Sequence, residues 1–327
     1  MRGIIGLVLA GLGAFLIAIA VLLPTWVVGQ VLKFPLSESE TATLEASNAT
    51  YFSVSALRER TGVTLEATYT ITGDAAAGSS STAVWNETSD VYDVTNHAQV
   101  QTMTRRFAFN RRTGQLVDCC GASVNGDKTV KQAGLVGYVF PIGTRRQTYQ
   151  VYDTTLKTTE PFVYSGQTTV DGIGVYEFVE NVTPTKIASV TLPGSYVHSA
   201  AASVTIGEYD AEHLTYYVDP ETGALVDVNE LQSTTLRTSA SAPPALVGLN
   251  ADLVATPASV TQIVGLDRSG RDELTLVGTT LPIASGVVGA IALVAGVFVR
   301  RRPQSGAAAR DGDVAPAVSG TGTDSGR

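Results

Sequence analysis

The chain has 327 residues and a formal net charge of −8. Between residues 3 and 299 the acidic excess is larger, with 27 acidic and 16 basic residues and a net charge of about −11. This balance argues against a nucleic-acid-binding protein, which needs a basic surface, and against attachment to anionic lipid headgroups by charge alone.

Two long uncharged apolar segments lie near the ends of the chain, from Gly3 to about Gly29 and from about Leu274 to Val299. Each exceeds the roughly 20 apolar residues that a helix needs to cross a bilayer. The sequence therefore predicts transmembrane helices at 1–29 and 274–299, an extracytoplasmic domain at 30–273, and a cytoplasmic tail at 300–327. The tail is rich in Gly, Ala, Ser and Pro without apolar periodicity, which predicts disorder.

The orientation follows from the basic cluster Arg300, Arg301 and Arg302, which comes directly after the second segment. Cytoplasmic flanks of membrane helices are enriched in Arg and Lys, so we expect a two-pass plasma-membrane protein with both termini in the cytoplasm. The alternative is a cleaved signal peptide, since Ala18-Ile19-Ala20 resembles a cleavage site. The apolar run continues through Trp26 and Val28, beyond the roughly 7–15 residues of a signal peptide, and this favours an uncleaved helix.

Small residues recur at helical spacing in both apolar segments. They are Gly6, Ala10, Ala14 and Ala18 in the first, and Ser285, Gly289, Ala292 and Gly296 in the second. Such stripes let helix backbones approach closely in lipid, which predicts that the helices pack on each other or on a second copy of the chain. The alternative is that Gly and Ala are simply common in membrane helices.

Between the apolar segments the sequence reads mainly as β-strands. Residues 63–72 alternate apolar and polar side chains, which is typical of a half-buried strand. Further predicted strands, rich in Thr, Val and Tyr, are 83–94, 99–110, 115–119, 134–141, 146–156, 162–170, 175–182, 186–192, 214–219, 224–237 and 245–254. The predicted fold is a mainly β domain, an antiparallel curved or barrel-like sheet, flanked by N- and C-terminal transmembrane helices.

Short irregular or helical pieces are predicted at three places. Residues 53–60 suit a short helical turn, and Thr256-Pro257 reads as the start of a short helix over 257–265. Residues 267–272 are expected to form a charged turn at the membrane surface.

One local pattern occurs twice, at 109–118 and at 217–227, and each copy reads as strand, Thr-Gly turn, strand. Glycine supplies the positive φ that such turns need. The pattern predicts two related hairpins within one domain, or else a chance similarity of a common turn.

The two cysteines, Cys119 and Cys120, are adjacent and are followed by Gly121. Three alternatives remain open: a vicinal disulfide that shapes a turn in an oxidising compartment, two reduced or buried thiols, and redox, metal or intermolecular chemistry. Zinc would need four ligands, and the three histidines (His97, His198 and His213) are scattered.

No catalytic motif stands out, because the chain has neither a glycine-rich phosphate loop ahead of a helix nor a nucleophile elbow. His213 lies near Glu208, Asp210 and Glu212, and we interpret this acidic stretch as a polar turn between strands. Another set of carboxylates would need the fold to bring its members together: Asp153, Glu160, Asp171 and Glu177. We therefore predict a non-enzymatic protein with no catalytic residue, no cofactor and no metal.

Several stretches resemble an actinobacterial membrane family often labelled the porin PorA family or a domain of unknown function. They are LPTWVVGQVLKFPL (23–36), TAVW (82–85), FNRRTGQLVDCCG (109–121), YQVYDTTL (149–156), YVDPETG (217–223) and DRSGR (267–271). The resemblance runs from about residue 1 to 299, and the stretch with Cys-Cys-Gly is fairly specific. It implies an actinobacterial envelope protein with the same two-span layout and carries over no catalytic residue.

Our leading hypothesis is a membrane-anchored protein whose outer β domain binds a ligand, in the first place a lipid or another apolar envelope component. The alternatives are an oligomeric channel, as the family label suggests, and an envelope scaffold. The partners expected are the lipid membrane, this ligand and further copies of the chain, with no nucleic acid.

Overall fold

The computed structural model describes residues 2–27 and 33–301, and the chain divides into two compact units. One unit holds the N-terminal helix as far as Val21 together with the chain from Pro282 onward, and the other spans 22–281. The predicted domain boundary at 29/30, the basic residue Arg302 and the predicted tail at 303–327 lie outside the described residues.

The helices are α1 (Arg2–Leu22), α3 (Pro257–Thr275) and α4 (Leu281–Arg301). A short π-helical segment, Leu23–Val27, continues α1, and another, Leu276–Thr280, joins α3 to α4. Two helical stretches, Ile4–Val27 and Pro257–Arg301, are long and apolar enough to cross a membrane.

Helices α1 and α4 approach closely at glycines. A Cβ atom on Gly13 would lie 2.6 Å from the carbonyl oxygen of Gly289, and one on Gly296 would lie 2.6 Å from the backbone nitrogen of Ala10. Gly6 also lies against Gly296. These contacts leave no room for larger side chains, as is typical of small-residue helix pairs.

The predicted stripe on the first helix is only partly placed in this contact. Ala14 and Ala18 lie on the exposed side of α1, and Gly13 occupies the position expected for Ala14. The reason is the helical repeat of 3.6 residues, because a stripe with strict four-residue spacing drifts around the helix, whereas alternating steps of four and three stay on one face.

In the part of the chain that the structure describes, the larger unit is built on twelve strands. They are β1 (Ser39–Ser53), β2 (Arg58–Gly73), β3 (Thr82–Asp93), β4 (Gln99–Asn110), β5 (Leu116–Val117), β6 (Ser123–Val124), β7 (Tyr149–Asp153), β8 (Thr158–Val170), β9 (Ile173–Leu192), β10 (Val204–Val218), β11 (Leu225–Arg237) and β12 (Leu246–Ala255).

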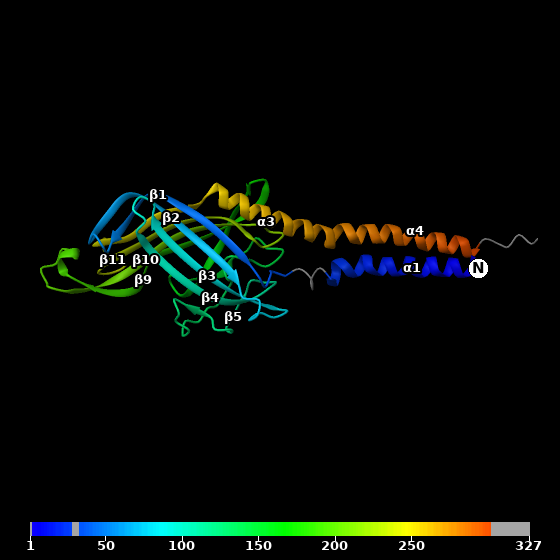
Figure 1. Cartoon of the computed structure of the whole chain (residues 1–327), viewed down its shortest axis with the longest axis horizontal. Coiled ribbons are helices and arrows are strands. Elements are labelled where there is room, and N and C mark those ends of the chain that lie inside the picture. Colours follow the sequence, from blue (N-terminus) through cyan, green and yellow to red (C-terminus); the bar gives the residue numbers. More distant parts are fainter. Residues whose placement is uncertain (1, 28–32, 302–327) are drawn as a thin grey trace, which may run out of the picture. The chain divides into compact units, whose positions relative to one another are not determined.

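These strands form one curved antiparallel half-barrel sheet (Figure 1). The strand order is β5-β4-β3-β2-β1-β12-β11-β10-β9-β8-β7, with β6 paired to β4. The two end strands of this order are connected through Leu135, which forms an antiparallel bridge to Gln115 and a parallel bridge to Val151. Backbone hydrogen bonds of 2.8 Å from Leu116 to Gly134 and 2.7 Å from Leu135 to Gln150 support this connection.

The segment 134–142 fills the interior of the half-barrel. Val136 and Val139 pack in a core cluster with Trp85, Phe107 and Phe109 from β3 and β4. Leu135 and Phe140 pack on the other side in a second cluster of buried residues: Tyr149, Val151, Phe162, Phe178 and Val218. The segment thereby joins the cores of the two halves of the sheet.

The two Thr-Gly turns predicted from the repeated pattern hold this same segment. Gly114 and Gly223 both have positive φ, +67° and +79°. A Cβ at either would collide with the carbonyl oxygens of Val139 and Phe140, respectively. Each glycine carbonyl also accepts a backbone hydrogen bond, from Val136 (3.0 Å) and Phe140 (2.7 Å). Glycine is therefore required twice, for the turn and for the close approach.

Four local predictions are wrong. Residues 53–60 form the hairpin between β1 and β2, and 134–141 is irregular chain that makes only isolated bridges. Helix α3 continues from Pro257 to Thr275, so the expected charged turn at 267–272 is helical. The acidic stretch around His213 belongs to strand β10.

Candidate functional site

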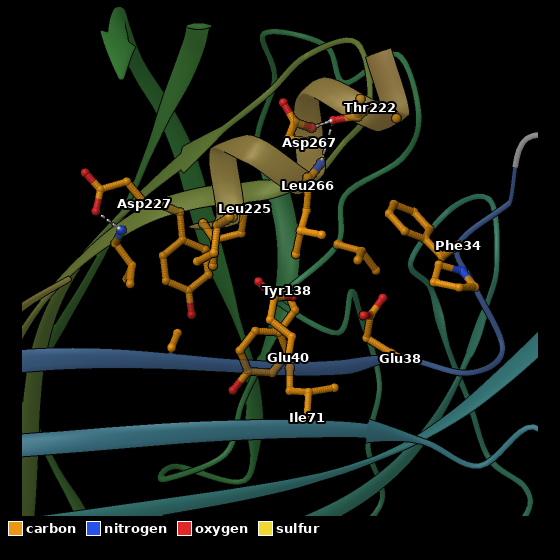
Figure 2. Close-up of a pocket in the computed structure, with 18 of the residues that line it drawn as sticks. Phe34, Glu38, Glu40, Ile71, Tyr138, Thr222, Leu225, Asp227, Leu266 and Asp267 are labelled. Atoms are coloured by element: carbon orange, nitrogen blue, oxygen red, sulfur yellow. Dashed lines mark hydrogen bonds between the residues drawn. The ribbon is translucent and has the colours of Figure 1, made fainter. Parts of the chain in front are cut away.

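A cavity of about 420 Å³ lies inside the larger unit, between the concave side of the sheet and helix α3 (Figure 2). Strands β1, β2, β3 and β11 contribute Leu44, Ile71, Trp85 and Val228, and α3 contributes Leu266. Further apolar lining comes from Phe34, Pro35, Ala42, Val139, Ile142, Ala224, Leu225, Ala255, Ile263 and Leu274. The predominance of apolar side chains makes this space suited to an apolar or amphiphilic molecule.

The charged side chains of the cavity are nearly all acidic. Among the described residues that line it, the carboxylates are Glu38, Glu40, Asp227, Glu230, Asp267 and Glu273, and the base is Lys33. Figure 2 shows the Glu38 side chain beside the apolar lining. Burial, and then the charge of Glu38, raises the pKa of Glu40. The electrostatic potential of the cavity is therefore negative.

A second cavity, of about 270 Å³, adjoins the first, and four residues line both: Tyr69, Tyr138, Tyr216 and Glu230. Tyr69 donates a 2.8 Å hydrogen bond to Glu230. Burial raises the pKa of Glu230 to about 7, and burial also raises the pKa of all three tyrosines. These four residues, the tyrosine layer, separate an apolar space from a polar one.

The polar side of the tyrosine layer contains a buried cation. Tyr138 donates a hydrogen bond to Glu87, whose other oxygen lies 3.7 Å from Arg105. The Arg105 guanidinium also donates to Gln132 at 2.8 Å and lies 5.0 Å from the centre of the Tyr152 ring. Burial raises the pKa of Glu87 despite Arg105. The network pairs the two buried charges, although Oε2 of Glu87 and Nη2 of Arg105 have no hydrogen-bond partner among the described residues.

Three buried carboxylates meet on the wall of the second cavity: Asp153 at the end of β7, Glu180 on β9 and Glu212 on β10. One oxygen of each lies within 4.8 Å of those of the other two. We refer to these three residues as the carboxylate cluster. Burial raises the pKa of Asp153 to about 6 and that of Glu180 to about 8, and burial raises that of Glu212 well above its usual range.

Sequence reasoning missed the cluster, although a signal was present. Glu208, Asp210 and Glu212 alternate with period two, so they share one face of a strand. The sequence also offered Asp153, Glu160, Asp171 and Glu177 as carboxylates that only the fold could bring together. Of these, Asp153 belongs to the cluster, whereas Asp171 lies in the turn between β8 and β9. His213, next to Glu212 on β10, lies on the opposite, exposed face of the strand, and its Nδ1 atom lies 2.5 Å from Oδ1 of Asn181.

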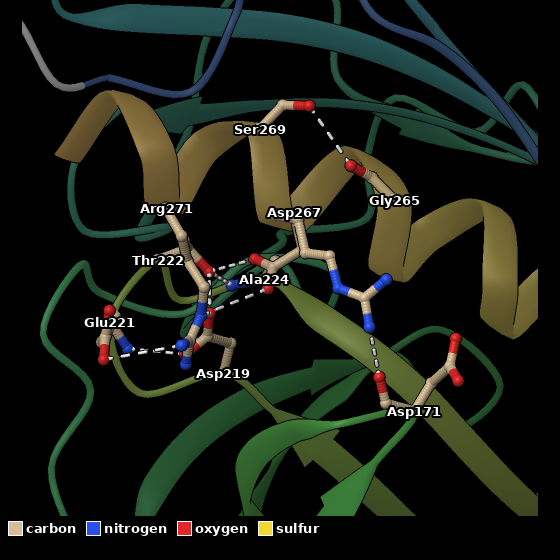
Figure 3. Close-up of polar contacts among 10 residues, drawn as sticks. Asp171, Asp219, Glu221, Thr222, Ala224, Gly265, Asp267, Ser269 and Arg271 are labelled. Atoms are coloured by element: carbon tan, nitrogen blue, oxygen red, sulfur yellow. Dashed lines mark hydrogen bonds and ion pairs between the residues drawn. The ribbon is translucent and has the colours of Figure 1, made fainter. Parts of the chain in front are cut away.

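Helix α3 is held to the turn between β10 and β11 by buried acidic side chains (Figure 3). Arg271 donates to both oxygens of Asp219, at 2.6 and 2.7 Å, and Thr222 donates to Asp267 at 2.5 Å. Asp219 and Asp267 are 0% and 5% exposed. These contacts fix the part of α3 that covers the apolar cavity.

Cys119 and Cys120 line neither of the two cavities. Cys119 and Cys120 follow β5 at the surface with their sulfur atoms 2.29 Å apart, and the carbonyl oxygen of Cys120 accepts a 2.9 Å hydrogen bond from Arg106. Their redox state stays a prediction. Arg300 and Arg301 end α4, and the orientation of the chain across a membrane also stays a prediction.

Comparison with known proteins supports membrane association. None of the curated proteins compared matches this chain. A family model described as Porin PorA matches residues 5–298, which includes both apolar helical stretches almost completely and the whole half-barrel. The chain therefore belongs to the porin PorA family.

Proposed function

We propose that this protein is a non-enzymatic envelope protein, anchored in the plasma membrane by two spans, whose half-barrel domain binds an apolar or amphiphilic molecule such as a lipid. The observation that carries the proposal is the 420 Å³ cavity with its mainly apolar lining. This volume falls in the range of roughly 300–1,000 Å³ that is usual for small-molecule sites.

The sequence positions of the lining residues support a ligand that comes from the membrane. Both Lys33 and Leu274 line the cavity. Lys33 follows the first apolar helical stretch, which ends at Val27, and Leu274 lies within the second, Pro257–Arg301. The acidic side chains Glu38, Glu40 and Glu273 would repel a headgroup with a net negative charge. We therefore expect a neutral or cationic polar group on an apolar body.

Lipid extraction from the full-length protein tests this proposal. The protein, purified in a mild detergent, would be analysed by native mass spectrometry and its bound lipids identified after extraction. We expect one neutral or cationic amphiphile per chain, and exchange with phosphatidylcholine vesicles in preference to phosphatidylglycerol vesicles. Protein without any bound amphiphile, before and after incubation with both kinds of vesicle, would contradict the proposal.

The second candidate is an oligomeric channel, and membership of the porin PorA family favours it. The apolar segments 4–22 and 274–299 carry no charged side chain that could line a pore. Two helices of one chain are too few to enclose a pore, so a channel would need several copies of the chain. Planar-bilayer recordings separate the two candidates. Stepwise conductance from purified protein would support the channel, and a silent bilayer at every voltage would exclude it.

A further inference from the structure

The carboxylate cluster concentrates negative charge at a buried point of the half-barrel. Glu180 is 1% exposed, Asp153 is 7% exposed and Glu212 is 8% exposed. Asp210, which is 0% exposed, contacts Glu212 through its side chain. Within residues 2–27 and 33–301, no Lys, Arg or His forms an ion pair with any of these four acids.

Glu180 is the most unusual member, because neither of its carboxylate oxygens has a hydrogen-bond partner. Buried polar atoms are normally satisfied, and each exception needs an explanation such as a bound ion. One of its oxygens lies within 4.8 Å of oxygens of Asp153 and Glu212. The side chain is therefore aimed at the centre of the cluster and has no hydrogen-bond partner there among the described residues.

Asp153 is held in a matching orientation. Its Oδ1 atom accepts backbone hydrogen bonds from Thr155 (2.7 Å) and Leu156 (2.8 Å), which close the turn after β7. Its Oδ2 atom is buried and has no hydrogen-bond partner within residues 2–27 and 33–301. One oxygen thus fixes the turn, and the other is free to bind an ion.

A strand irregularity lies beside the cluster. Asp210 of β10 pairs with Thr185 of β9, whereas Glu212 pairs with Val182, so β9 carries one more residue than β10 between these pairs. Such bulges re-aim side chains and are frequent at functional sites. Here the bulge, which contains Pro184, lies between the strand partners of Asp210 and Glu212.

We infer that Asp153, Glu180 and Glu212 form a binding site for a hard divalent cation, with Ca²⁺ the first candidate. Ca²⁺ takes six to eight oxygen ligands at about 2.3–2.6 Å, so two oxygens on one ion are at most about 5 Å apart. The spacing within the cluster meets this limit. The donor set is entirely carboxylate, which suits Ca²⁺ or Mg²⁺ better than zinc, and the adjoining cavity has room for water ligands.

The ion would tie the end of β7 to β9 and β10 across the intervening strand β8. Its positive charge would neutralise the buried acids on the polar side of the tyrosine layer. This role is independent of what the apolar cavity binds.

Calorimetric titration tests the inference. Full-length protein in mild detergent, stripped with EDTA and dialysed, would be titrated with CaCl₂ and melted with and without the ion. We expect one Ca²⁺ per chain, a Kd below about 1 mM, and a Tm that rises with the Ca²⁺ concentration. Glu180→Gln and Glu212→Gln should each weaken binding by about tenfold or more.

The variants also distinguish a cation-binding site from a group of buried acids that binds no cation. Without Ca²⁺, Glu180→Gln should melt at or above the wild-type Tm, because it removes repulsion, and with Ca²⁺ it should melt below. Glu160→Gln, on β8 and outside the cluster, should weaken Ca²⁺ binding far less than Glu180→Gln, because Glu160 acts on Asp153 and Glu180 through its charge alone. Either of two results would overturn the inference. The first is a titration without heat and without a Tm shift at about 10 mM Ca²⁺, Mg²⁺ or Mn²⁺. The second is a loss of binding in Glu160→Gln that equals the loss in Glu180→Gln.

Discussion

Arg271 of helix α3 holds Asp219, a carboxylate with no exposed surface, through two hydrogen bonds of 2.6 and 2.7 Å. The pair joins α3 to the turn that follows β10, and it lies beside the apolar cavity, which α3 helps to line. A fully buried carboxylate without its cation is strongly destabilising. This ion pair should therefore control whether α3 stays in place over the cavity.

Replacing Arg271 with Ala should lower the free energy of unfolding by about 3 kcal/mol, at the lower end for a buried pair because Arg271 itself is 26% exposed. Thermal melting of the full-length protein in detergent measures the effect. Arg268→Ala is the matched control, since Arg268 lies on the same helix and donates to an exposed backbone carbonyl, that of Asp171, with no ion pair among the described residues. Its loss should cost less than about 1 kcal/mol. Equal melting of both variants would contradict the importance of the Arg271–Asp219 pair.

Stability should depend on pH through Asp267. Burial raises the pKa of Asp267 to about 7, and the neighbouring Asp219 raises it further as the second cause. The groups that face this part of α3 are Asp219, Glu221, Thr222 and Arg271. In the unfolded chain an Asp loses its proton near pH 3.9. Between these values the folded state binds more protons, so the free energy of unfolding falls as the pH rises from about 4 to about 7.

Asp267→Asn should remove this part of the pH dependence, whereas the exposed Asp272→Asn on the same helix should keep it. The carboxylate cluster also titrates in this window, so the readout is the difference in slope between wild type and variant. Denaturant unfolding at a series of pH values measures that slope. A variant with the wild-type slope would show that Asp267 is ionised in the folded protein at pH 5.

The helix pair offers a test with a closely matched control. Gly13→Ile would place a side chain against the backbone of Gly289 and Leu293, where a Cβ already lies 2.6 Å away. Overpacking of this kind costs about 1–3 kcal/mol. Gly11→Ile adds the same side chain where nothing lies within 4 Å. We expect cross-linking between cysteines introduced on the two helices to fall for Gly13→Ile only, and loss in both variants would point to a general effect on α1.

The sequence predicted the fold class and much of the sheet, and the misses have physical causes. The predicted strand 99–110 matches β4, and 224–237 and 245–254 match β11 and β12 to within one residue. Strand β12 alternates in the usual sense, with Leu249, Ala251, Leu253 and Ala255 toward the core. The prediction failed where the interior is polar. Asp210 and Glu212 face inward on β10, whereas an acidic stretch of this kind is more typical of a polar turn between strands, which is what we predicted.

Long-range contacts explain the other differences. Residues 134–141 are apolar because they fill the interior between two Thr-Gly turns, and not because they pair as a strand. Helix α3 passes through Gly265 and Gly270, which locally disfavour a helix, because Arg271 and Asp267 are held by the turn after β10. The apolar cavity and the carboxylate cluster both depend on such pairings of distant segments, which a single sequence does not reveal.

The most direct test of the central claim is to fill the apolar cavity and measure bound amphiphile. Ala42 of β1 lines the cavity, and the adjacent Thr41 is exposed on the opposite face of the strand. Native mass spectrometry would compare Ala42→Phe with Thr41→Phe in the full-length protein. We predict that Ala42→Phe loses most of the bound amphiphile at an unchanged fold, whereas Thr41→Phe retains it. Equal occupancy in the two variants, or no amphiphile in the wild type, would contradict the account.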